Sequence, residues 1–254
     1  MASKAFYAVV AGVGPGTGAA VALRFAKAYP VVVLARKPES YNDVVADIKK
    51  SGGKAIGIST DIADPESVAS AFATIKKELP NTKLAAAIYN VGGGFGVKPF
   101  LESSIEEIDA SLQSSPRGLY NFAKASLPLL LESTEDSPYP PTLLVTGATA
   151  SLKGSARFGL FAAGKFAKRA LAQSLAREFG PKGVHVAHVI VDGIIDIPRT
   201  AQREANGGAP DGKLKPDQNA DRGKQIAENY WFLHTQHRSA FTQELDLRPY
   251  VEKF

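Results

Sequence analysis

Short apolar runs alternate with longer segments of helical periodicity along most of the chain. Several of these runs are hydrophobic on both faces, which is typical of strands buried in a parallel sheet. They predict strands at Phe6–Ala11, Val31–Ala35, Lys54–Ile58, Leu84–Tyr89, Thr142–Thr146, Val184–Val191 and Thr242–Leu245. The helical patterns lie at Gly16–Ala28, Tyr41–Ser51, Pro65–Leu79, Ile105–Leu131 with a break at Pro116, Gly154–Phe179 and Asp221–His234. This alternation predicts an α/β protein built from βαβ units around a parallel sheet.

One segment departs from the alternation. Residues Arg199–Asp221 are rich in glycine and proline and poor in large apolar side chains, so they predict a loop or mobile lid. The chain has 254 residues and is 44% hydrophobic, a size and composition compatible with one large core. We therefore expect a single domain over residues 1–254, with a substrate loop inserted at about 199–221.

Composition narrows the classes of partner. The net charge of +5 is modest, and the cations are scattered without the long basic run of a nucleic-acid arm. The absence of cysteine excludes disulfides, thiolate nucleophiles and cysteine metal sites, and the histidines show no metal-ligand spacing. No apolar stretch approaches the roughly 20 residues of a membrane span, and the first residues lack a signal-peptide pattern. The expected location is the cytoplasm, and the expected partner is a small molecule rather than nucleic acid or membrane.

A glycine-rich turn follows the first predicted strand and precedes the first predicted helix. It reads Ala11-Gly12-Val13-Gly14-Pro15-Gly16-Thr17-Gly18. Glycines let the backbone approach a pyrophosphate, whose charge then lies at the amides and positive dipole of a helix N-terminus. The turn predicts a dinucleotide site, and the alternative is a turn that is merely tight.

The second predicted strand ends at Ala35-Arg36-Lys37, where a dinucleotide-binding fold reaches the 2′ position of the adenosine ribose. An acidic residue there would bind the 2′-hydroxyl of NAD, whereas Arg36 and Lys37 suit a 2′-phosphate. The pair favours NADP(H). The alternative interpretation is two solvated cations at a strand end.

The spacing of Gly12, Gly16 and Gly18 resembles the glycine motif of the short-chain dehydrogenases/reductases. Further landmarks of that family are resembled, in order, by Asp61-Ile62, Asn90-Val91-Gly92-Gly93 and Val191-Asp192-Gly193-Ile194-Ile195-Asp196. The resemblance covers nearly the whole chain and implies a doubly wound Rossmann sheet of seven mostly parallel strands, with helices on both faces. It also implies a nicotinamide cofactor across the carboxyl ends of the strands and a homodimer or homotetramer built on the long helices. The cofactor-binding residues it implies are Gly12, Gly16, Gly18, Arg36, Lys37, Asp61, Ile62, Asn90, Gly92, Lys165, Gly193 and Ile195.

The family's catalytic residues are mostly absent. Its YxxxK motif aligns with Phe161-Ala162-Ala163-Gly164-Lys165, so the lysine is present and the phenol is not. The other family positions fall on residues that lack the usual groups: the serine on Ala148, the helix asparagine on Ser115, the proline after the sixth strand on Asp192 and the following threonine on Ile197. The chain resembles a subgroup of the family that has Phe for Tyr and keeps the lysine.

Phenylalanine cannot donate a proton to an oxygen that becomes negative during hydride transfer. Loss of such a general acid reduces rates by roughly a hundred to ten thousand-fold, so simple ketone reduction is expected to be slow. Phe161 and Lys165 lie one helical turn apart, and Lys165 is expected to hold the nicotinamide ribose. Three groups are candidates to replace the donor: Thr149 beside the serine position, Asp192 as a desolvated acid or else a turn cap, and Lys165 itself.

Other aromatic and basic residues are expected to pack or to line a pocket. His185 and His188 lie in a strand pattern and are expected to be core or interface residues, while His234 and His237 follow Trp231 on the last helix. The run Tyr230-Trp231-Phe232 predicts packing or a pocket wall. Arg157 and Phe158 precede the helix that carries Phe161 and are candidates for the same pocket.

Two functions remain open from the sequence. The first is an NADP(H)-dependent reductase whose substrate needs little from a tyrosine, such as a small carbonyl, enone or imine, because the cofactor carries the hydride chemistry. The second is a non-redox protein on the same scaffold, such as a cyclase, an isomerase or a cofactor-responsive partner.

Overall fold

The computed structural model describes residues 5–92, 96–216 and 225–253, and within them seven parallel strands form one sheet in the order β3-β2-β1-β4-β5-β6-β7. The strands are β1 Phe6–Ala11, β2 Val31–Ala35, β3 Ala55–Ser59, β4 Lys83–Tyr89, β5 Thr142–Thr146, β6 His185–Val191 and β7 Glu244–Leu247. The order reverses between β1 and β4, so the turns after these two strands are neighbours at one edge of the sheet. The predicted doubly wound parallel sheet is confirmed.

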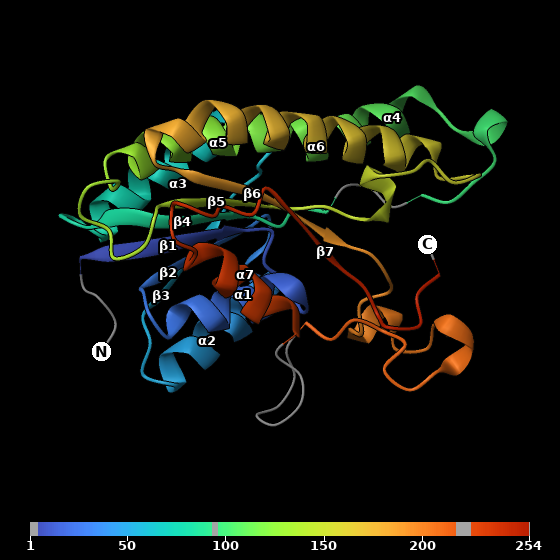
Figure 1. Ribbon diagram of the computed structural model, residues 1–254, viewed down its shortest axis with the longest axis horizontal. Helices are drawn as coiled ribbons and strands as arrows, with labels where there is room; N and C mark the ends of the chain where they lie inside the picture. The colour runs from blue at the N-terminus through green and yellow to red at the C-terminus, as the bar shows by residue number, and fades with distance from the viewer. Residues whose placement is uncertain (1–4, 93–95, 217–224, 254) are drawn as a thin grey trace.

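Helices cover both faces of the sheet (Figure 1). One layer holds α1 Thr17–Ala26, α2 Asn42–Lys50 and α7 Gln225–His234, and the other holds α3 Pro65–Glu78, α4 Ile105–Leu112, α5 Gly118–Leu131 and α6 Gly159–Phe179. Side chains of β1 alternate between the two cores: Ala8 and Val10 pack in the first, Tyr7 and Val9 in the second. The alternation follows from the period of two along a strand.

One predicted break is confirmed, and two element boundaries are displaced for local reasons. The long helix is broken where expected, because a π-helical segment at Gln113–Arg117 that contains Pro116 separates α4 from α5. Helix α6 begins five residues later than predicted, since Arg157 has a positive φ of 71° just before it. Strand β7 is displaced toward Leu247, because Thr242 instead bonds the Gln236 side chain through its backbone N–H.

Residues 196–216 form a compact excursion after β6. Its two ends are joined by a parallel bridge between Ile195 and Leu214, and the Lys213 ammonium donates to the carbonyls of Thr200 and Ala201 at 3.1 and 2.9 Å. The loop predicted at Arg199–Asp221 is therefore folded over its described part, and residues 217–221 lie outside the described residues, as does the predicted start of the last helix at Asp221. In Figure 1 the excursion lies beside the last residues of the chain.

The aromatic run near the end of α7 packs. Tyr230 is buried, and Trp231 stacks edge-on to Phe25 and carries the Arg24 guanidinium 4.2 Å above its ring. His234 is buried between the Tyr29 hydroxyl and Thr142, with both contacts at 2.9 Å. The sequence left packing and a pocket wall as alternatives for this run. Tyr230 and Trp231 pack, and Phe232 is exposed.

Candidate active site

The glycine turn after β1 is closed against the end of β4. Gly12 has a φ of +85°, and a Cβ on it would lie 2.6 Å from the Asn90 carbonyl oxygen. A Cβ on Gly18 would lie 2.5 Å from the Gly12 carbonyl oxygen. Gly16, with a φ of +147°, caps α1 and accepts the Ala20 N–H at 3.0 Å. These positions exclude side chains and leave the N-terminus of α1 facing the turn, which is the arrangement that accepts a pyrophosphate.

Asn90 ties three strands together at this edge. Its side-chain amide donates to the Gly12 carbonyl at 3.0 Å, and its side-chain oxygen accepts from the Thr146 hydroxyl at 3.0 Å. Thr146 in turn bonds the Tyr230 hydroxyl at 2.6 Å. The Asn90 side chain therefore sets the distance between the glycine turn and the ends of β4 and β5. Gly92 follows it in an exposed position, and Gly93 lies outside the described residues.

The predicted ribose and adenine residues lie beyond β2 and β3. Arg36 and Lys37 are exposed, and neither has a side-chain partner among the described residues. The Asp61 carboxylate accepts the Ala63 N–H at 3.0 Å, and the Asn121 side chain donates to the carbonyl of the buried Ile62 at 3.1 Å. The two cations are thus available to bind an anion. The Asp61-Ile62 turn is held in place by Asn121 of α5.

The sixth strand leads into a segment that lies on the glycine turn. Gly193 has a φ of +146°, and a Cβ on it would lie 2.9 Å from the Pro249 ring. The Ile195 carbonyl accepts from the Thr200 hydroxyl, which fixes the start of the excursion. The Ile197 side chain reaches to 2.9 Å from the place a Gly16 Cβ would occupy. Gly193 and Ile195 therefore shape the segment that brings Ile197 over the turn.

Lys165 is buried on α6, and its ammonium nitrogen lies 5.0 Å from the centre of the Phe161 ring. Burial lowers the pKa of Lys165, and the neighbouring Lys168 side chain acts in the opposite direction. Lys168 is fully buried one turn further along the same face. Its Nζ lies 3.4 Å from the Val91 carbonyl oxygen and 5.5 Å from the centre of the Tyr89 ring. Sequence reasoning missed Lys168, although its spacing from Phe161 and Lys165 places it on their face of the helix.

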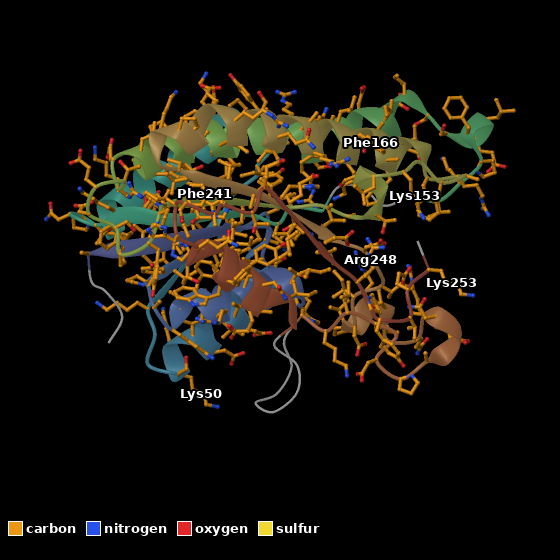
Figure 2. The ribbon with its side chains drawn as sticks, viewed as in Figure 1. Lys50, Lys153, Phe166, Phe241, Arg248 and Lys253 are labelled. Atoms are coloured by element: carbon orange, nitrogen blue, oxygen red, sulfur yellow. The ribbon has the colours of Figure 1, made fainter. Side chains whose placement is uncertain are left out.

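Thr149 and Asp192 contact each other. The Thr149 hydroxyl donates to one carboxylate oxygen of Asp192, and the Arg248 guanidinium lies 3.5 Å from the other. Figure 2 shows Arg248 where the end of the sheet meets the excursion. Asp192 is buried between these two partners. This arrangement favours the interpretation of Asp192 as an anchor of the segment after β6.

Ser115, which the motif alignment predicts at the family's asparagine position, is buried in the π-helical segment, and its hydroxyl oxygen has no hydrogen-bond partner among the described residues. Ala148, predicted at the serine position, offers a methyl group, and its N–H donates to the Ser151 hydroxyl at 3.2 Å. Neither position therefore offers a side-chain donor that other hydrogen bonds hold in place to bind an oxyanion.

A cavity of about 320 Å³ lies next to Phe161. Its lining includes Lys98, Phe100, Glu107, Arg157, Leu160 and Phe161. Lys98 and Glu107 form an ion pair at 2.7 Å, so Arg157 supplies the unmatched positive charge of this lining set. The expectation that Arg157 shares a pocket with Phe161 agrees with this lining; Phe158 is not among the residues that line it.

The histidines of β6 are internal. Both ring nitrogens of His185 lie within 3.0 Å of backbone carbonyl oxygens, and its ring stacks on Phe241. His188 bonds Glu244 at 3.1 Å. Within the described residues no cluster of three or more His, Asp or Glu side chains is arranged to hold a metal ion. No described helix is long and apolar enough to cross a membrane.

Residues 7–206 match the profile of the family described as short chain dehydrogenase. The chain belongs to the short-chain dehydrogenase family. A 1,6-dihydroxycyclohexa-2,4-diene-1-carboxylate dehydrogenase from Acinetobacter baylyi is 30% identical over 198 residues, which cover 78% of this chain and 72% of the relative. The versicolorin reductase of Emericella nidulans is 28% identical and covers 84% of this chain and 78% of its own length.

Solved structures of the family give the same result. A short-chain dehydrogenase from Rhodopseudomonas palustris is 30% identical, with a TM-score of 0.76, and the alignment covers 98% of this chain and all of the other. One from Burkholderia cenocepacia, solved in complex with NADP, is 26% identical with a TM-score of 0.78 over 96% of both chains. This short-chain dehydrogenase therefore has the family's fold.

Proposed function

We propose that this short-chain dehydrogenase is an NADP(H)-dependent reductase of a small organic carbonyl, enone or imine, with an active site that lacks the serine and tyrosine pair. One observation carries the proposal: glycines stand at the close contacts of the turn after β1, and two exposed cations without a side-chain partner among the described residues, Arg36 and Lys37, follow β2. The residues fit NADP(H), since a guanidinium and an ammonium match a 2′-phosphate. The NADP complex of the Burkholderia cenocepacia relative supports the same choice.

When bound, the cofactor supplies hydride. Gly12, Gly16, Gly18, Asn90 and Gly92 would bind its pyrophosphate and neighbouring groups at the edge of the sheet, and Arg36 and Lys37 would bind the 2′-phosphate. The Asp61-Ile62 turn would accept the adenine, and Gly193 and Ile195 the nicotinamide end. Lys165 would hold the nicotinamide ribose through its ammonium.

The proton needed by the reduced substrate would come from Lys165, directly or through water. Asp192 and Thr149 are less suited, because each is already engaged with the other and the Arg248 guanidinium lies beside the Asp192 carboxylate. Lys165 keeps a donor next to Phe161, and its lowered pKa makes proton release easier. Activated double bonds need the least acid assistance, so enones and imines are preferred among the substrates proposed.

Cofactor binding is the first prediction to test. Titration of the protein with NADPH and with NADH, followed by nicotinamide fluorescence, should show NADPH binding at least about tenfold more tightly. Arg36→Ala and Lys37→Ala should each weaken NADPH binding and leave NADH binding unchanged, because NADH has no 2′-phosphate. Lys50→Ala, at the exposed end of α2, serves as the matched control.

Equal affinity for the two nucleotides would overturn the choice of NADP(H). No binding of either would overturn the reductase itself and favour a non-redox function on the same scaffold. With binding established, loss of NADPH absorbance in step with consumption of an enone, imine or quinone would identify the reaction, whereas a cyclase or isomerase would leave the absorbance unchanged.

A further inference from the structure

The cavity beside Phe161 is small, and most of its lining is apolar. Phe100, Ala110, Leu160 and Phe161 all contribute to its walls. Its volume of about 320 Å³ is at the lower end of the range for sites that bind small organic molecules. A water molecule takes about 30 Å³ of liquid volume, so the cavity has room for a compound of roughly ten non-hydrogen atoms. The carbon skeleton of such a compound would pack against these side chains.

The charged side chains of the lining leave one positive charge over. Lys98 and Glu107 form an ion pair at 2.7 Å, and the hydrogen bond from Lys98 lowers the pKa of the Glu107 carboxyl. Arg157 lines the same cavity and has no carboxylate partner among the described residues. Its guanidinium stays charged at every physiological pH and has five N–H donors. The cavity therefore combines an apolar lining with one cation that is available to an anionic group.

The backbone at Arg157 has a conformation that residues other than glycine rarely adopt. Its φ is +71°, in the left-handed region that favours glycine. The Lys98 N–H donates to the Arg157 carbonyl at 3.1 Å, which holds this conformation against the segment before α4. Strained residues of this kind are concentrated at functional sites. An arginine where glycine would fit with less strain is therefore a candidate for a functional side chain.

The start of α6 adds to the positive potential of the cavity. Gly159, Leu160 and Phe161 are the first three residues of this 21-residue helix, and all of them line the cavity. The first turn contains no acidic side chain, and Phe158 before it has no side-chain oxygen to cap it. The amide dipoles of this turn are therefore left to act in the same direction as the guanidinium of Arg157.

The cavity also lies next to the group that the proposed reaction uses. The Phe161 ring lines the cavity, and its centre lies 5.0 Å from the Lys165 ammonium nitrogen. We propose that the cavity binds a small organic carboxylate with an apolar skeleton, and that Arg157 determines this specificity by pairing with the carboxylate. The inference names a substrate class and rests on the proposed function for its catalytic meaning, whereas the binding itself needs no cofactor.

The direct test is the binding of two fluorinated probes to cofactor-free protein, followed by 19F NMR. 4-Fluorobenzoate and 4-fluorobenzamide have the same number of non-hydrogen atoms and differ in charge. The benzoate should bind about tenfold more tightly, because a hydrogen bond between two charged groups is stronger than one to a neutral amide. Equal affinities, or no binding of either probe, would overturn the inference.

Two substitutions remove the same charge from the same loop. Arg157→Met should reduce benzoate binding to the level of the amide. Lys153→Met is the matched control, because Lys153 is exposed before α6 and does not line the cavity (Figure 2). It should change benzoate affinity by less than about twofold, since salt and water screen a distant surface charge. Equal losses in the two variants would indicate general attraction by a basic surface and would overturn the role of Arg157.

A third substitution tests whether the probe occupies the cavity. Ala110 lines the cavity from α4 and is exposed, so Ala110→Phe places a ring in the space that the probe needs. Binding of both probes should be lost in this variant. Unchanged binding would place the probes elsewhere on the protein and would overturn the inference.

Arg157→Gly separates recognition from a structural role. Glycine adopts a φ of +71° without strain, so the Tm should be unchanged or higher while the preference for benzoate is lost. A lower Tm with an unchanged preference would make Arg157 a structural residue and overturn the inference. If Arg157→Met failed to fold, Arg157→Gly would decide the question in the same titration.

Kinetics connect the cavity with the reaction. The enone 3-oxocyclohex-1-ene-1-carboxylate and its carboxamide form a matched pair of substrates. In each, the β carbon of the C=C bond receives hydride and the α carbon a proton, while NADPH is oxidised to NADP+. The carboxylate should have a KM about tenfold lower at a similar kcat, because the anion is bound equally before and during hydride transfer. Arg157→Met should remove this difference in KM.

The outcomes separate this inference from the proposed function. A preference for benzoate in a protein that binds no NADPH would support the anion site and overturn the reductase. NADPH-dependent reduction with no preference for the carboxylate, in binding or in KM, would overturn the anion site and leave the reductase.

Discussion

Phe161 turns a ring face toward the Lys165 ammonium. The motif alignment predicts that the family has a phenol at this position. A ring face attracts a cation, so the contact holds Lys165 in the site but offers no proton. Under the proposed function, general acid catalysis by a phenol is lost at Phe161, and the orientation of a positive charge is kept. The side chain of Phe161 differs from a tyrosine by one hydroxyl group.

Restoring that oxygen gives a prediction. Phe161→Tyr should increase turnover of a simple ketone with NADPH by roughly tenfold or more, because the new phenol lies beside an ammonium that lowers its pKa. Phe166→Tyr, on the outer side of the same helix, should have no effect. Steady-state kinetics on both variants provide the measurement, and equal rates would mean that the serine position limits the reaction as well.

Individual residues differed in how well the sequence predicted them. Gly12, Gly16 and Gly18 were predicted from spacing, and a Cβ would meet backbone atoms at Gly12 and Gly18 and the Ile197 side chain at Gly16. Thr149 and Asp192 were identified by position, but their mutual contact and Arg248 depend on the fold of the last residues of the chain. Lys168 was missed, since a lysine in a helical pattern usually marks the solvent face.

Among the elements, β6 is notable for polar residues that are wholly buried. A Cβ on Gly147 at the end of β5 would lie 2.2 Å from the His188 ring, so the ring fills the space beside the glycine. Burial lowers the pKa of His188 to about 4 and that of His234 on α7 to about 3. Both histidines are therefore neutral in the folded protein over most of the acidic range.

This predicts a loss of stability in acid. As the pH falls below 6.5, the histidines of the unfolded chain take up protons before those of the folded chain, so unfolding is favoured until the folded pKa is reached. The free energy of unfolding should decrease by about 1.4 kcal/mol per pH unit for each buried histidine. Urea denaturation between pH 7 and pH 4 measures this free energy. It should fall less steeply with decreasing pH in His188→Gln than in the unmodified protein, and equally steeply in the exposed His237→Gln. A matching slope in His188→Gln would contradict the assignment.

Element boundaries were predicted best where burial alone decides them. Strands β1, β2 and β5 begin and end at the predicted residues, because an apolar run between turns leaves little choice of where the strand starts and stops. The start of α6 and the position of β7 were displaced by Arg157 and by the Thr242 contacts. Such contacts link residues from different elements, so a local pattern carries no signal of them.

At the scale of the whole molecule, the layer of α4, α5 and α6 presents apolar side chains to solvent. Leu112, Tyr120 and Phe166 are all exposed, and Figure 2 shows Phe166 on this layer. The resemblance to the family implies a homodimer or homotetramer built on the long helices, and an exposed apolar face is what such an interface requires.

Assembly through this layer is a prediction of its own. Phe166→Glu should reduce the molar mass measured by light scattering toward that of one 26.9 kDa chain, because a carboxylate at the centre of an apolar interface loses its hydration. Tyr250→Glu, an exposed aromatic position outside the helical layer, should leave the mass unchanged. A monomeric unmodified protein would contradict the prediction outright.

The contact between Asn90 and Gly12 joins residues 78 positions apart, and it closes only when β1 pairs with β4. All six strand pairings in the sheet are parallel, and each needs a long crossover before it forms, so loop-closure entropy opposes every one of them during folding. A fragment that ends before β4 would contain the glycine turn but not the asparagine that closes it. Nucleotide affinity is therefore expected only after β4 has paired with β1. Its recovery during refolding would report this long-range pairing rather than the formation of helices.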